Sequence, residues 1–197
     1  MAEIPAISDV PFGSPDIIRE LKLAVDTLAG RIGGNVDYGT IDGVRTKALD
    51  IVHLCNMGRI KARAYRKAAQ NIDAYGHTKV AIDTISFDTE GVVDTTNSRI
   101  TPNLAGYYQV SGQIYVGGVR DGEEVFSGIY KNGAVAAWGS RSPSGIYRAN
   151  ISPVTNLIYC NGTTDYLELW AYNSYSSPLP LSAGKSYQNY ISIVGPF

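Results

Sequence analysis

The clearest pattern in the sequence is an alternation of apolar and polar residues in the C-terminal part of the chain. From Tyr107 to Val116, alternate positions carry the apolar residues or glycine of one face, which are Tyr108, Val110, Gly112, Ile114 and Val116. A period of two predicts a half-buried β-strand. Further strand-like runs follow at residues 125–131, 134–138, 157–160, 166–172 and 187–194.

Turn-forming residues separate these runs. They are Lys131-Asn132-Gly133, Ser142-Pro143-Ser144-Gly145, Asn161-Gly162 and Ser182-Ala183-Gly184. Many short strands with no helical pattern between them predict an antiparallel β-sandwich or barrel. We therefore expect a mainly β head domain over residues 76–197, with a domain boundary near residues 72–78.

The N-terminal part has a helical pattern instead. Ser14-Pro15-Asp16 is typical of a helix start, and Gly33-Gly34 of a helix end. Between them runs one apolar stripe, made of Ile17, Leu21, Val25, Leu28 and Ile32. The stripe predicts either a helix packed on its own chain or a short parallel coiled coil in which Leu21, Val25, Leu28 and Ile32 hold an oligomer together.

A second helix is predicted from Thr46 to Gln70. Its end carries the basic run Arg59–Lys67, with five basic residues and no acidic one. Such a run is typical of a solvated helix face, and the alternative is contact with an acidic partner or with nucleic acid. Residues 1–72 are thus expected to form a helical attachment and oligomerisation base.

Composition narrows the functional classes. The 197 residues have a formal net charge of -1, which provides no general attraction to nucleic acid. Fourteen Tyr and 21 Gly against four Phe suit β-structure and interfaces. Cys55 and Cys160 have no disulfide or metal spacing and predict free thiols. The N-terminus lacks a signal peptide pattern, and no apolar run is long enough to span a membrane, so we expect synthesis in the cytosol.

Catalytic and metal-binding motifs are absent from the sequence. His53 and His77 have no ligand spacing, and no nucleophile or phosphate-loop motif occurs. The candidate carboxylates are Glu123 with Glu124, Asp165 with Glu168, and, as weak calcium ligands, Asp83, Asp88 and Asp94. We expect no enzyme activity, no metal and no cofactor, with polysaccharide hydrolysis by a carboxylate pair as the alternative.

Aromatic residues beside Gly- and Ser-rich connectors are the better candidates for function. Trp138, Tyr147 and Tyr175 are expected to be exposed and to contact a ligand or receptor, since such rings stack on sugars or anchor interfaces. Trp170 and Tyr172 alternate with Leu167 and Leu169 and are expected to fill the core or a trimer axis.

The order of motifs after Tyr75 resembles the globular head of the complement first component's q subunit, a trimeric jelly roll shared with the tumour necrosis factor superfamily. The matching pieces, in order, are Ile85-Ser86-Phe87-Asp88, Arg99 to Ser111 with its Thr101-Pro102 and Gly106-Tyr107-Tyr108, Ile129-Tyr130-Lys131-Asn132-Gly133, Asn161 to Leu169, and the last strand Ser186 to Ile193. Ile100, Val110 and Gln113 stand where the family commonly has aromatic residues.

This resemblance implies a homotrimeric jelly-roll head. A collagen-like stem is missing, and the helical base instead makes the chain similar to bacteriophage fibre, spike or capsid decoration proteins. We therefore expect a structural virion protein, made in the host cytoplasm, that attaches to a capsid or other virion protein through residues 1–72 and displays its head for contact with a surface or receptor. The alternatives are a tail-fibre-type adhesin that binds a host surface glycan, a polysaccharide depolymerase, and a soluble host ligand.

Overall fold

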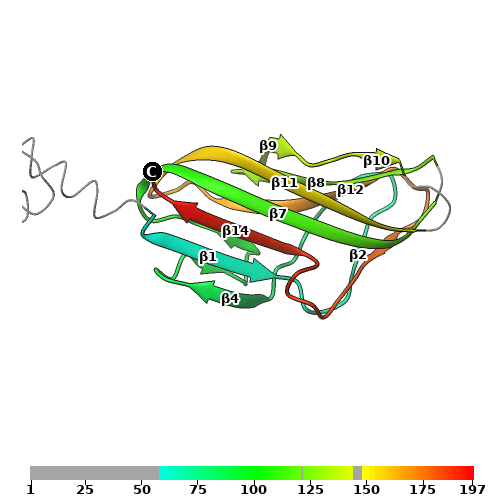
Figure 1. Ribbon diagram of the computed structural model, residues 1–197, viewed down its shortest axis with the longest axis horizontal. Helices are drawn as coiled ribbons and strands as arrows, with labels where there is room; N and C mark the ends of the chain where they lie inside the picture. Colours follow the sequence, from blue (N-terminus) through cyan, green and yellow to red (C-terminus); the bar gives the residue numbers. More distant parts are fainter. Residues whose placement is uncertain (1–57, 121, 144–147) are drawn as a thin grey trace, which may run out of the picture. The chain divides into compact units, whose positions relative to one another are not determined.

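The computed structural model describes residues 58–120, 122–143 and 148–197, and these form two antiparallel sheets packed face to face (Figure 1). Sheet A has seven strands in this part of the chain, in the order β2-β13-β7-β14-β1-β4 with β11 paired to β7. Its strands are β1 (Ile60–Tyr65), β2 (Gln70–Ile72), β4 (Thr84–Asp88), β7 (Ala105–Val119), β11 (Arg148–Asn161), β13 (Leu179–Leu181) and β14 (Tyr190–Gly195).

Sheet B also has seven strands among the described residues, in the order β10-β8-β12-β6-β5, with β3 paired to β12 and β9 to β8. Its strands are β3 (Gly76–Lys79), β5 (Val93–Asp94), β6 (Arg99–Ile100), β8 (Glu124–Lys131), β9 (Ala134–Trp138), β10 (Ser142–Pro143) and β12 (Leu167–Asn173). In Figure 1 the long strands β7 and β14 lie beside β1 in one layer, and β8 and β12 run in the layer behind them.

The core lies between the sheets and confirms the alternation expected for the long strand. In β7, Tyr108, Val110, Ile114 and Val116 are fully buried, while Tyr107 is half exposed. Gly112 lies on the same buried face, where a Cβ would stand 2.8 Å from Cδ1 of Leu169 in the other sheet. The glycine therefore permits the close approach of the two sheets at this point.

The hairpin expected at Lys131-Asn132-Gly133 joins β8 to β9. Asn132 and Gly133 both have positive φ, 54° and 77°, as a two-residue type I′ turn requires. The Asn132 side chain also donates to Asp165 Oδ1 at 2.7 Å and accepts from the Tyr166 N–H at 2.9 Å. These bonds connect the hairpin to the start of β12.

The predicted helix from Thr46 to Gln70 is wrong from residue 60 onward, because Ile60–Tyr65 is strand β1. It pairs with β14 on one side and β4 on the other. Ile60, Ala62 and Ala64 face the core with no exposed surface, which the period-two alternation with Lys61, Arg63 and Tyr65 explains. The basic run thus overlaps a strand, which places Lys61 and Arg63 on the outward face of sheet A.

This strand also corrects the N-terminal limit of the head. β1 and β2 precede the boundary expected near residues 72–78, yet both pair with strands of sheet A. The jelly roll therefore includes residues from Ile60 onward. The expected helix with Leu21, Val25, Leu28 and Ile32 lies outside the described residues.

No helix capable of spanning a membrane occurs among the residues that the structure describes. Cys160 is a buried free thiol, and burial raises its pKa to about 11. Cys55 and His53 lie outside the described residues.

Candidate functional site: two outward sheet faces

The outward face of sheet A collects most of the exposed apolar side chains of the described residues. Tyr107 on β7 lies directly opposite Tyr159 on β11, and their rings are 5.4 Å apart, edge to face. Six large hydrophobic residues on strands of this sheet are at least 46% exposed: Ile85, Phe87, Tyr107, Ile151, Leu157 and Tyr159. We call this surface, with the residues between them, the apolar face of sheet A.

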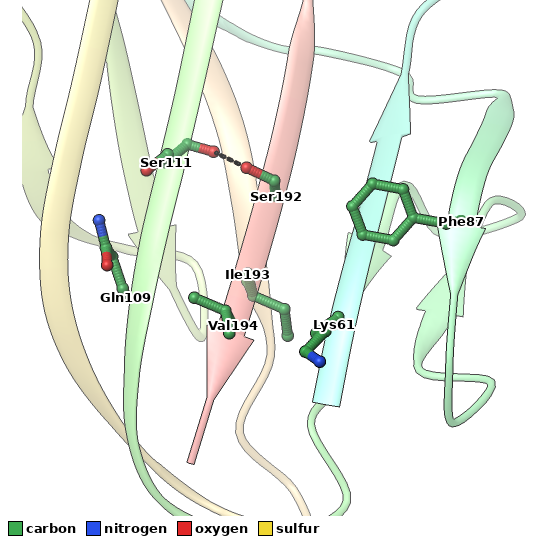
Figure 2. Close-up of a pocket in the computed structure, with 7 residues that line it drawn as sticks. All are labelled: Lys61, Phe87, Gln109, Ser111, Ser192, Ile193 and Val194. Carbon is green, nitrogen blue, oxygen red and sulfur yellow. Dashed lines mark hydrogen bonds between the residues drawn. The ribbon is translucent and has the colours of Figure 1, made fainter. Parts of the chain in front are cut away.

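A shallow pocket of about 320 Å³ lies on the same face, over β7, β14, β1 and β4 (Figure 2). It is lined by Lys61, Phe87, Gln109, Ser111, Ser192, Ile193 and Val194. Ser192 Oγ donates to the Ser111 carbonyl oxygen at 3.4 Å and links β14 to β7, while Lys61 brings a positive charge to the lining. A partly apolar surface of this kind is typical of an association interface.

The outward face of sheet B carries a group of aromatic side chains, of which Trp138 and His77 are exposed and Phe126 is buried beneath its neighbours. Trp138 on β9 is 40% exposed and lies over Gly128 of β8, where a Cβ would stand 2.8 Å from its Cζ3 and 2.9 Å from its Cε3. Its ring is 5.2 Å from Phe126 and 5.9 Å from Tyr130, edge to face with both. We call the whole group the aromatic cluster, and its members are His77, Phe126, Tyr130, Trp138, Trp170 and Tyr172.

Neighbouring strands build the rest of the cluster by cross-strand stacking. Phe126 stacks on Tyr172 with centroids 4.6 Å apart, and Tyr130 stacks on Trp170 at the same distance. His77 on β3 lies 4.7 Å from Tyr172 and 5.1 Å from Trp138. Burial lowers the pKa of His77 and raises that of Tyr130. His77 is therefore neutral at pH 7, and its Nδ1 lies 3.3 Å from the Tyr130 hydroxyl.

The structure corrects the expected position of Trp170 and Tyr172. Leu167, Leu169 and Ala171 of β12 face the core, so the period of two turns Trp170 and Tyr172 outward, where both are half-buried. They belong to the aromatic cluster rather than to the core between the sheets.

The three ligand-contact residues expected from the sequence are placed differently. Trp138 lies in the aromatic cluster, and Tyr147 lies outside the described residues. Tyr175 is partly buried against the core, with the Arg120 guanidinium 4.6 Å from its ring centre. His77, Phe126 and Tyr130 were not among the expected contact residues. The signal for two of them is the aromatic-Gly-aromatic pattern at positions 126, 128 and 130.

Three of the four candidate carboxylates, Asp165, Glu168 and Glu124, are held in structural bonds, whereas the buried Glu123 Oε2 has no hydrogen-bond partner. Asp165 accepts hydrogen bonds from Lys131, Asn132 and the Asn161 N–H, and these lower its pKa. Glu168 pairs with Lys79 at 2.5 Å and accepts from the indole N–H of Trp170 at 3.0 Å. Glu124 lies 3.9 Å from Arg141. A carboxyl group that must donate a proton in hydrolysis needs a raised pKa, and Asp165 has the opposite shift.

The three weak candidates for calcium ligands likewise close turns. Burial alone would raise the pKa of Asp83, but the N–H groups of Lys67 and Ala68, the Thr84 hydroxyl and Arg66 bring it below its usual value. Asp88 accepts from the Val93 N–H at 2.8 Å. Asp94 bonds to Asn97 and Arg99. Among the described residues no cluster of metal-ligating side chains is present.

The sequence matches no protein-family profile and no curated protein. Solved structures give matches at low identity. The crystal structure of murine APRIL at pH 5.0 is 9% identical with a TM-score of 0.51, and the match covers 68% of this chain and 97% of that one. Eiger TNF from S. frugiperda is 14% identical with a TM-score of 0.47, covering 70% and 92%. The globular domain of zebrafish complement 1qA is 8% identical with a TM-score of 0.47, covering 69% and 96%.

The likeness to APRIL shows the fold of the described residues. They form an antiparallel jelly roll like that of murine APRIL. The jelly roll expected from the motif order is therefore confirmed.

Proposed function

We propose that this chain is a structural virion protein of a bacteriophage, of the head fibre, decoration or spike type. Its jelly-roll head forms a homotrimer through the apolar face of sheet A. Its N-terminal region attaches the head to a capsid or other virion protein, and sheet B is displayed for contact with a host surface. The chain is made in the host cytoplasm and has no enzymatic role.

The proposed homotrimer is supported by one observation, which is that the exposed apolar residues are divided unequally between the two sheets. Of the large hydrophobic residues that are exposed, six lie on strands of sheet A, and two, Val135 and Trp138, lie on strands of sheet B. Exposed apolar surface concentrated on one face is a mark of association with another protein. The jelly-roll fold is consistent with association through this face, and we propose that the partners are copies of the same chain.

A glycan-binding adhesin of the tail-fibre type is the second candidate, and the aromatic cluster favours it. Clustered, half-exposed rings beside polar groups suit recognition more than assembly into a capsid lattice. The bonded state of Asp165, Glu168 and Glu124 speaks against a depolymerase.

The test of the homotrimer is a charge placed on the apolar face of sheet A. Leu157 is 58% exposed, so Leu157→Asp should change the stability of a single head by no more than about 0.5 kcal/mol. In a trimer the same carboxylate would be buried without a partner, which costs several kcal/mol at each interface. Light scattering of the full chain should therefore give a trimer for the wild type and a monomer for the variant.

Val135→Asp is the matched control, since Val135 is 44% exposed but lies on β9 of sheet B. It should remain trimeric. A wild-type chain that stays monomeric at micromolar concentration would refute the proposal, as would a trimer that Leu157→Asp leaves intact.

A further inference from the structure

We infer that the aromatic cluster on sheet B is a binding site for an uncharged sugar. This inference rests on the proposed display of sheet B and names the class of molecule that this surface contacts.

The side chains of Trp138 and His77 extend across the sheet toward each other. Their strands, β9 and β3, are separated by β8 and β12. Strands lie about 4.8 Å apart, so the two backbones are about 14 Å from each other. The two ring centres are nevertheless only 5.1 Å apart. Both side chains must therefore lie across the sheet, over the rings of β8 and β12, and they form a continuous aromatic surface.

Part of this aromatic surface is exposed to water. The cluster is outside the core, which is already closed beneath it by Ile129, Leu169 and Ala171. Trp138 still has 40% of its surface in contact with water, and His77 is also exposed. A ring face carries negative charge density, and the C–H groups on one face of a pyranose carry the complementary positive density. An exposed aromatic surface of this kind therefore fits the apolar face of a sugar ring.

Two polar groups lie among the rings, the Tyr130 hydroxyl and the imidazole of His77. Together they offer a donor and acceptors beside the apolar surface, as the hydroxyl groups around a sugar ring require.

The charge of the surface selects an uncharged sugar. The Lys79 ammonium is neutralised by Glu168, and His77 is neutral at pH 7. Arg141 lies over the Phe126 ring at 4.5 Å, and Glu124 lies 3.9 Å from it. Lys79 and Arg141 therefore each have a carboxylate neighbour, so an acidic sugar gains less from either of them than from an unpaired cation.

The chain provides its own reporter for this site. It contains two tryptophans, and both belong to the aromatic cluster. Tryptophan emission of the full chain therefore reports on this surface alone. The probes are the methyl glycosides of glucose, galactose, mannose and N-acetylglucosamine, with methyl glucuronide as the acidic comparison, each titrated at millimolar concentration.

At least one neutral glycoside should change the tryptophan emission saturably, and methyl glucuronide should bind more weakly than the neutral sugar that matches it. Saturation-transfer NMR should show binding at least about tenfold weaker in Trp138→Ala. Val135→Ala, on the same strand and similarly exposed, should bind like the wild type. Trp138→Phe retains a stacking ring and should bind better than Trp138→Ala, which separates loss of the ring from loss of the fold.

The inference is overturned if none of the neutral glycosides binds, if Trp138→Ala binds as well as the wild type, or if the glucuronide binds best. Light scattering on the same samples keeps the two proposals apart. Absent sugar binding by a trimer refutes the sugar site alone, and sugar binding by a monomer supports the site while refuting the homotrimer.

Discussion

At the scale of single residues, Gly128 determines how the aromatic cluster is built. It lies between Phe126 and Tyr130 on the outward face of β8, and the indole of Trp138 covers it. A methyl group at this position would stand less than 3 Å from two ring carbons, which is closer than van der Waals contact allows. The missing side chain therefore lets a tryptophan from the neighbouring strand lie flat between two other rings.

This contact predicts the effect of one methyl group. Gly128→Ala should push the indole of Trp138 away from the sheet and destabilise the head by about 1–3 kcal/mol, as overpacking does. Thermal unfolding would measure the loss, and tryptophan emission should move to longer wavelength as the ring enters water.

Gly117→Ala is the control, because Gly117 also lies in a strand but has nothing within 4 Å of its added Cβ. It should leave both the melting temperature and the emission nearly unchanged. Equal effects of the two alanines would mean that the cost at position 128 comes from the backbone and not from the ring.

At the scale of elements, β1 decides where the domain begins. It lies between β14 and β4 in sheet A and buries Ile60, Ala62 and Ala64 completely. β2 adds Ile72, also fully buried. A fragment that starts at residue 76 lacks both strands.

We predict that residues 76–197 alone do not fold, whereas residues 58–197 do. Losing the two buried isoleucines costs about 1.5–3 kcal/mol each, and β14, β4 and β13 lose their partners in the ladder. Together this approaches the whole stability of about 5–15 kcal/mol of a typical domain. Circular dichroism during heating should show a cooperative transition for the longer fragment alone. A cooperative transition in the shorter one would show that β1 is dispensable.

The elements also show what the sequence could predict. The long alternation of β7 and the Asn-Gly turn of the β8–β9 hairpin were predictable, because both depend on local pattern. β1 was predicted as helix because its small alanines and basic residues satisfy a helix as well as a strand. Only the pairing of β1 with β14 and β4, two strands that are not its neighbours in sequence, favours the strand over the helix.

Strand β11 was predicted only in its second half for a related reason. Its first half buries Asn150 and Ser152, whose polar side chains hide the alternation. Their partners come from the other sheet: Asn150 donates to the Val125 carbonyl, and Ser152 accepts from the Ser127 N–H. Pro153 fits because β11 is an edge strand. The aromatic cluster was predictable only as single rings, since its members come from four strands.

At the scale of the whole molecule, the place of β1 in sheet A shortens the N-terminal region that is available for the proposed attachment to a particle. β1 and β2, which fall within the base expected over residues 1–72, belong to sheet A. In the proposed function, attachment to a particle then falls to the segment before residue 58. We predict that a chain lacking residues 1–57 forms a folded trimer in solution but is absent from purified virions.

Immunoblots of particles assembled with the truncated chain in place of the full one would measure this. Light scattering of the free truncated chain is the control for folding and trimerisation. Incorporation at normal occupancy would place the docking surface in the head, in conflict with the proposed role of the N-terminal region.

The two outward faces of the sandwich have a consequence for how strongly a particle could hold a host. Sheet A and sheet B expose opposite sides of the head, so trimerisation through one leaves the other open in all copies. A single sugar held on an open surface dissociates quickly, but in the proposed function a trimer would present the same surface several times and a particle would present many trimers. Linked sites raise the effective concentration of each further contact and can strengthen overall attachment by about 10²–10⁴ without any new bond. Such avidity would let a particle bind reversibly to a host surface that carries few sugar ligands and firmly to one that carries many. Each individual site could remain weak, because symmetry repeats it.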